Sequence, residues 1–169
     1  MINWAYFPRS HPLPDHLRQV VRAFENHAEE IASETNEGQE SNAALAKVPD
    51  SLEAIGMQVE RGKTRAQKIY FPVLVGRNGA VEKSFEADAF WQEGRFVLEV
   101  EAGRAVVNYQ FLKDLFQACM MQGVDFLGIA VRNRYRTSND FEKVFSFFDT
   151  LYKSGRLRLP FEGVLIIGY

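Results

Sequence analysis

The chain has 169 residues, of which 46% are hydrophobic and 13% aromatic, enough apolar material for one domain with a hydrophobic core and too much for a disordered chain. Its net charge of −2 lacks the basic excess typical of a dedicated nucleic-acid-binding protein, and its single cysteine excludes a disulfide framework and a cysteine zinc site. The sequence contains neither an apolar run of the about 20 residues that a spanning helix needs nor a signal-peptide pattern at its N-terminus. We therefore expect one soluble, cytoplasmic domain comprising residues 1–169, without a membrane partner.

The first half of the chain is expected to begin with helices. Apolar residues at helical spacing predict a helix over residues 15–33, which Pro14 and Asp15 are suited to start. The polar, aperiodic stretch 34–42 indicates a loop, and a short helix over residues 49–55 should end at Gly56.

Three strands joined by hairpins should follow. Residues 68–75 are rich in β-formers, and Pro72 within them indicates an edge strand or a bulge. Asn78-Gly79 is a strong hairpin signal before a second strand over residues 81–91. A tight turn at Glu93-Gly94 should lead into a third strand over 95–101.

The second half alternates helices and strands. The pattern predicts a helix over residues 105–122, a buried strand over 125–131, a helix starting at Asn139 and a closing strand over 163–167. Glu142, three residues after Asn139, fits a capping box. Together the elements predict a single α/β (α+β) domain with a central mixed sheet and helices on both faces.

Four carboxylates on the second and third predicted strands share a face. Alternate residues of a strand point the same way, and closure of the hairpin at Glu93-Gly94 would put Asp88 opposite Glu99 and Glu86 opposite Glu101. Like charges opposed at about 4.5–5.5 Å between Cβ atoms are destabilising, and a divalent cation such as Mg²⁺ would reverse that effect. The competing interpretation is the solvated face of an antiparallel sheet, and a register slip of one residue would separate the pairs.

Residues 52–131 resemble the PD-(D/E)xK, restriction-endonuclease-like nuclease superfamily. The resemblance rests on Asp88, on Glu99-Val-Glu101 eleven residues later and on the polar residues of the helix that follows. The predicted element order is similar to its αβββαβ core, with a C-terminal αβ addition. Ala87 stands where the superfamily often has Pro, and Glu101 replaces the motif Lys, as in the BamHI- and BglII-like branch or in an inactive relative. Lys63, Lys68 and Lys113 are candidates for a lysine supplied from elsewhere.

The resemblance implies a Mg²⁺-dependent DNA endonuclease, with Mn²⁺ able to replace Mg²⁺. Asp88 and Glu99 would be the metal ligands, and Glu101 would orient or deprotonate the attacking water. Glu53 is the candidate for a further catalytic acid from an upstream helix, and its alternative interpretation is a solvent-facing helix residue. The expected catalytic set is therefore Asp88, Glu99, Glu101 and Glu53.

Double-stranded DNA is the partner that the resemblance implies. Basic residues cluster at 61–68, where there are four and no acid, and at 132–136, where three arginines flank Tyr135. Such loops suit phosphate contacts or stacking, although exposed basic loops are common. Polar positions of the helix after the third strand are further candidates, unless they are only its solvated side. The expected nucleic-acid-binding residues are Arg104, Asn108, Gln110, Lys113, Arg132, Arg134 and Arg136.

Cleavage of both strands needs two active centres, so a homodimer is an expected assembly, with the first helix a candidate interface. The absence of GxxxxGK and GxGxxG motifs disfavours a nucleotide cofactor. The second hypothesis is a catalytically inactive nuclease-fold protein that binds nucleic acid or protein, which the missing Lys favours. A third is a metal-binding protein of unrelated α/β fold.

Overall fold

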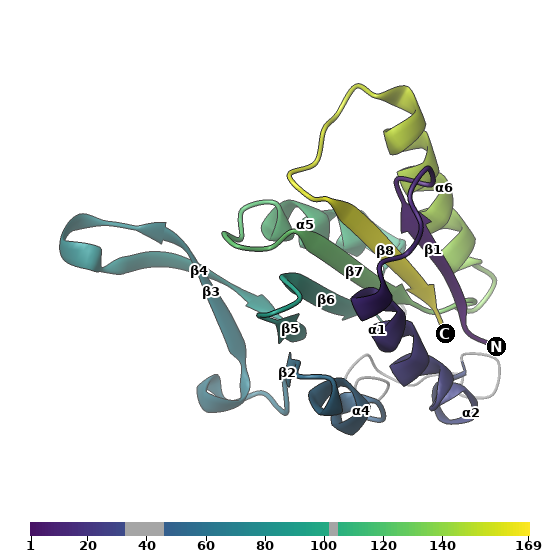
Figure 1. The fold of residues 1–169 in the computed structure, drawn as a ribbon, viewed down its shortest axis with the longest axis horizontal. Helices are drawn as coiled ribbons and strands as arrows, with labels where there is room; N and C mark the ends of the chain where they lie inside the picture. Colours follow the sequence, from purple (N-terminus) through teal and green to yellow (C-terminus); the bar gives the residue numbers. More distant parts are fainter. Residues whose placement is uncertain (33–45, 102–104) are drawn as a thin grey trace.

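The computed structural model describes residues 1–32, 46–101 and 105–169, and its centre is a mixed six-stranded sheet (Figure 1). The strand order is β1-β8-β7-β6-β5-β2. The central strands β6, β7 and β8 are parallel, and the outer strands pair antiparallel to their neighbours. The sheet strands are β1 (Asn3–Phe7), β2 (Gln58–Val59), β5 (Ala89–Trp91), β6 (Phe96–Glu101), β7 (Phe126–Val131) and β8 (Gly163–Gly168).

Helices cover both faces of this sheet, as the sequence predicts. On one face lie α1 (Asp15–Glu25), α2 (Ala28–Ile31) and α4 (Pro49–Ala54), whose apolar residues form one hydrophobic core with the sheet. On the other face α5 (Gln110–Ala118) and α6 (Asp140–Ser154) contribute to a second core. The α+β class with a mixed sheet is therefore confirmed, and the continuous apolar sequences of β7 and β8 reflect burial on both faces.

Strands β3 (Ile69–Val75) and β4 (Val81–Ala87) form a separate two-stranded ribbon that projects from the main sheet (Figure 1). We call this ribbon, residues 69–87, the arm. Only Phe71 and Ala87 of the arm are buried, and the Phe71 ring packs edge-on against Phe90 with ring centroids 4.6 Å apart. The prediction of three consecutive strands in one sheet is thus wrong, because the chain breaks at Asp88 between β4 and β5.

Other element boundaries also differ from the predictions. Strand β1, which pairs with β8 at the sheet edge, was not predicted. The helix predicted over residues 15–33 divides at Asn26 and His27 into α1 and α2, and the predicted loop 34–42 lies outside the described residues. The helix predicted from residue 105 begins at Gln110, after a 3-10 turn in which Asn108 has a φ of 63°.

Two smaller expectations, a capping box at α6 and a dimer interface on α1, also differ from the structure. The side chain of Asn139 makes no hydrogen bond at the start of α6, so the capping box is not formed. The apolar face of α1, including Leu17, Val20 and Phe24, is buried in the first core, so this face cannot supply a dimer interface. Among the described residues, no helix has the length and apolar character needed to cross a membrane.

Candidate active site

A polar pocket of about 640 Å³ opens where the arm leaves the main sheet, beside the carboxyl end of β6. Its walls come from four parts of the chain: the segment after β2, the arm, β6 with the preceding Asp88, and α5. Its charged lining residues are Glu60, Lys63, Lys68, Lys83, Glu86, Asp88, Glu99, Glu101, Lys113 and Asp114.

Strand β6 brings two carboxylates to the pocket. Its residues alternate between the two cores: Leu98 lies in the core with α1, and Val97 lies in the core with α5. Glu99 and Glu101 share the face of Val97, so both side chains point to the α5 side of the sheet. Glu99 is only 9% exposed although it carries a carboxyl group.

Asp88 lies at the break between β4 and β5. Its Oδ2 accepts a hydrogen bond from the backbone N–H of Val100 at 2.7 Å, which fixes the carboxylate beside β6. The predicted hairpin register holds in β5, where Ala89 pairs with Leu98. It does not extend to Glu86, because β4 turns away and Glu86 pairs with Tyr70 in the arm instead of with Glu101. The Glu86 side chain forms an ion pair with Lys68.

Helix α5 contributes a carboxylate that the sequence analysis did not include among the metal ligands or catalytic residues. Asp114 is 4% exposed, and its carboxyl group forms a hydrogen bond with that of Glu101, which the raised pKa of Glu101 keeps protonated. The nearest cation is Lys113, whose Nζ lies 3.8 Å from Asp114 Oδ1. Two acidic groups held together in a buried position are costly to maintain, which makes Asp114 the clearest sign of a functional requirement in this pocket.

The electrostatics of the pocket favour the neutral forms of its acids. Burial raises the pKa of Asp88 to about 6 even though the Val100 hydrogen bond opposes the shift. Burial, and then the charges of Asp88 and Asp114, hold the pKa of Glu99 well above its usual range. Burial together with the Asp114 carboxylate raises the pKa of Glu101 to about 8, and burial also raises the pKa of Asp114.

A cation would reverse these effects, and the donor set suits Mg²⁺. Six carboxylates face four lysines in the pocket, so the ionised site carries excess negative charge. No three or more His, Cys, Asp and Glu side chains of the described residues are arranged as a ready metal site. Mg²⁺ commonly takes only one or two carboxylates and completes its octahedron with water and phosphate oxygens. The buried carboxyl groups of Asp114 and Glu99 fit that need.

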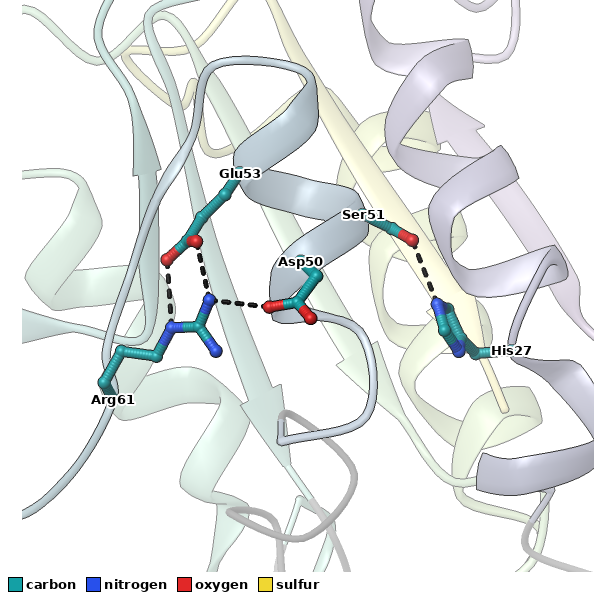
Figure 2. Close-up of polar contacts among 5 residues, drawn as sticks. All are labelled: His27, Asp50, Ser51, Glu53 and Arg61. Carbon is teal, nitrogen blue, oxygen red and sulfur yellow. Dashed lines mark hydrogen bonds and ion pairs between the residues drawn. The ribbon is translucent and has the colours of Figure 1, made fainter.

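Glu53 does not belong to this site. Its two carboxylate oxygens accept hydrogen bonds from Arg61 Nε and Nη2, at 2.9 and 2.6 Å, and Arg61 Nη2 also bonds Asp50 (Figure 2). Nearby, His27 Nε2 and Ser51 Oγ are 2.9 Å apart and join α4 to the segment before α2. Glu53 does not line the pocket, so the expectation of a catalytic role for Glu53 is not supported by its position.

The predicted nucleic-acid contacts fall in different environments. Lys113 lines the pocket, whereas Asn108 and Gln110 lie at the start of α5 outside its lining. Arg132 is 3% exposed and hydrogen-bonded to Tyr169, a position unsuited to a phosphate contact. Arg134 and Arg136 are exposed just after β7, at the same edge of the sheet as Glu101, and Arg104 lies outside the described residues.

Glu60 and Asp114 are the pocket acids that the sequence did not single out. Asp114 belongs to a polar stripe with Gln117 on α5. Because α5 connects the parallel strands β6 and β7 and packs back on the sheet, the sequence could have indicated that this stripe lies near β6. Glu60 is placed by a hydrogen bond from its backbone N–H to the Asp88 carbonyl at 2.7 Å, a long-range contact without a local sequence signal.

Comparison with known proteins adds no relationship: no protein-family model, curated protein or solved structure gives a significant match to this chain.

Proposed function

We propose that this protein is a metal-dependent DNA endonuclease whose active site is the carboxylate pocket. The observation that carries the proposal is the burial of Glu99 and Asp114 beside Asp88 and Glu101, with no arginine among the pocket lining. Such clustered acids with raised pKa values are typical of functional sites rather than of a solvated sheet surface.

Glu99, together with Asp88 or Asp114, would hold the cation, since their oxygens are the hard donors that Mg²⁺ and Mn²⁺ prefer. When bound, the metal would polarise the scissile phosphate and lower the pKa of the attacking water. The Val100 N–H positions the Asp88 carboxylate for this role by hydrogen bonding to one oxygen, leaving the other free.

Glu101 is the residue best suited to take a proton from the attacking water. Its carboxyl group interacts with Asp114, and a pKa of about 8 keeps it close to the range in which it can both accept and release a proton. Lys113, which lies against Asp114, and Lys68, paired with Glu86, bring positive charge to the pocket rim. These lysines would bind the phosphate and supply charge that a lysine at position 101 would otherwise provide.

The topology gives this proposal further support. β5 and β6 are antiparallel, α5 follows β6, and β7 returns parallel to β6, an order compatible with the restriction-endonuclease-like resemblance of residues 52–131. Double-stranded DNA in the cytoplasm remains the proposed substrate, and a homodimer would provide the two centres needed to cut both strands.

The test is incubation of the purified protein with supercoiled plasmid and with linear single- and double-stranded DNA, in Mg²⁺, Mn²⁺ or EDTA. We expect cleavage that requires metal and is abolished by Asp88→Ala and by Glu99→Ala. Glu53→Ala is the matched control, because Glu53 is an acid outside the pocket. Metal-independent cleavage, or cleavage retained by both pocket variants, would refute the assignment.

A second candidate function is a nuclease-fold protein without turnover that binds nucleic acid. It is favoured by Glu101 in the motif Lys position and by the lack of a ready three-ligand metal group among the described residues. Metal-dependent thermal stabilisation and DNA binding without any cleavage would select it over the enzyme.

A further inference from the structure

The positive charge of the chain is concentrated in one continuous stretch that contains the arm. Residues 61–87 hold six Lys or Arg and two Glu, a net charge of +4 in a chain whose overall net charge is −2. The remainder of the chain is therefore clearly acidic. A local basic element on an acidic protein is a means of directing a polyanion to one place on the surface.

Four of these cations have no carboxylate partner in the part of the chain that the structure describes. Arg61 is paired with Asp50 and Glu53, and Lys68 with Glu86. The other four form no ion pair: Lys63, Arg65, Arg77 and Lys83.

The unpaired cations extend from the carboxylate pocket to the tip of the arm. Lys63 and Lys83 line the pocket, whereas Arg65 lies in the 3-10 turn before the arm and Arg77 lies at its tip. They therefore form a basic track that begins where the proposed cleavage would occur. Figure 1 shows the arm reaching well beyond the main sheet, so a ligand that followed this track would lie along the arm.

The arm has the shape of an element that is completed by a partner. An isolated two-stranded ribbon is marginally stable in water. The base of this one packs on the second core, but its outer part, residues 74–83, has no third strand or helix covering it among the described residues. Leu74, Val75 and Val81 near its tip are each more than half exposed. The major groove of a duplex accommodates a two-stranded ribbon, and apolar side chains there can contact thymine methyl groups.

We propose that the arm enters a groove of double-helical DNA, while Lys63, Arg65, Arg77 and Lys83 contact its phosphates and hold the duplex across the carboxylate pocket. This inference rests on the proposed nuclease function for the identity of the polyanion. Pro72 removes a backbone donor from β3 and so weakens edge-to-edge pairing with a second copy of the chain, which leaves the phosphates of a nucleic acid as the partner that fits the positive charge of the arm.

The test measures binding of a short fluorescent DNA duplex in EDTA, where metal-dependent cleavage cannot contribute. The variant Lys63→Ala/Arg65→Ala/Arg77→Ala/Lys83→Ala should bind at least about tenfold more weakly, and the slope of log K against log salt should fall by roughly 3 to 4. The control Arg156→Ala/Arg158→Ala, which removes two exposed arginines between α6 and β8, should bind like the wild type.

A second variant removes the outer part of the arm itself, together with Arg77 and Lys83. Replacing residues 73–83 with Asn-Gly closes a shorter hairpin between the paired positions Pro72 and Ser84, and keeps the buried contact of Phe71. We expect lost duplex binding with an unchanged melting temperature and an unchanged oligomeric state by light scattering. Wild-type duplex affinity in both variants would overturn the proposal. Dissociation of an oligomer in the shortened-arm variant would also overturn it, and so would equal binding of duplex DNA and anionic vesicles by the wild type.

The binding and cleavage assays together distinguish a failure of the arm proposal from a failure of the proposed nuclease function. Arm-dependent duplex binding without metal-dependent cleavage would retain the arm assignment and refute the nuclease. Cleavage that needs Glu99, together with duplex binding that ignores both arm variants, would retain the nuclease and refute the arm assignment.

Discussion

Two acidic clusters lie on elements that cover opposite faces of the sheet, and they differ in how their charge is balanced. Asp50 and Glu53 on α4 are substantially exposed and share one guanidinium, that of Arg61 (Figure 2). Glu99 and Asp114 are almost fully buried, and the lysine nearest to Asp114 is 3.8 Å away and mostly exposed. The first cluster is a complete surface ion-pair network, whereas in the second Lys113 is the only cation of the described residues within ion-pair distance of Glu99 or Asp114.

This difference distinguishes an acid that stabilises the fold from one that serves a ligand. Exposed carboxylates paired with Arg61 gain modestly from the pairing and need nothing further. Buried carboxylates without such a partner lower the stability of the fold, so they indicate a gain elsewhere, typically in binding or catalysis. The sequence placed both acids in the expected catalytic set, Glu99 as a metal ligand and Glu53 as a further acid or a solvent-facing helix residue, and of the two only Glu99 lines the pocket.

The largest expected effect is on cleavage. Glu99→Gln removes a negative oxygen from the pocket with little change in shape, and we expect DNA cleavage to fall roughly 100-fold or more. Glu53→Gln makes the same chemical change in the Arg61 cluster and should leave the cleavage rate near that of the wild type. Initial rates on plasmid DNA in Mg²⁺ provide the measurement. Equal losses in the two variants would remove the functional distinction between the clusters.

The same two variants should change stability in opposite directions. At pH 8 without metal, Glu99→Gln relieves the burial of a carboxylate and should raise the free energy of unfolding by roughly 1 kcal/mol. Glu53→Gln weakens an ion pair and should slightly destabilise the protein. Urea denaturation in EDTA gives both values. A Glu99→Gln protein less stable than the wild type would mean that Glu99 has a structural role.

Stability should also depend on pH, with a sign that the buried acids determine. The pKa of Glu101 rises to about 8 and that of Asp88 to about 6 in the folded protein, so the folded state binds more protons than the unfolded state between about pH 4 and pH 8. The stability that the neutral forms of these two acids provide is complete below their pKa values in the unfolded chain. It is lost as the pH rises through their pKa values in the folded protein. In EDTA the melting temperature should therefore fall by roughly 3 °C or more between pH 5 and pH 8.

Glu101→Gln and Mg²⁺ sharpen that pH experiment. The variant should flatten the fall between pH 5 and pH 8, since its side chain does not titrate, and Mg²⁺ should restore stability to the wild type at pH 8. A melting temperature that rises over this interval in the wild type would contradict the assigned pKa directions.

The smallest effect is expected at Arg61. Arg61→Ala leaves the exposed Asp50 and Glu53 in water, so the melting temperature should fall by about 2 °C or less in low salt, and less in high salt. A large, salt-independent loss would show that the α4 cluster is more than a surface network.

The strands and helices around the site were largely readable from periodicity, because local patterns determine them. The two-residue alternation on β6 correctly put Glu99 and Glu101 on one face, and the β5–β6 register was correctly predicted. The break at Asp88 was not, because it depends on β4 pairing with β3 away from the sheet. The position of Glu60 depends on a long-range contact, so the sequence alone could not assign it to the site, whereas the polar stripe of α5 did contain a signal for Asp114.

Metal binding itself is the most direct test of the carboxylate pocket. Calorimetric titration of the purified protein with Mn²⁺, without DNA, should show binding in the wild type and in Glu53→Gln, and greatly weakened binding in Glu99→Gln and Asp114→Asn. That result would show that the buried acids, and not the acids paired with Arg61, form the cation site. Wild-type affinity in all three variants, or no binding to the wild type, would contradict it.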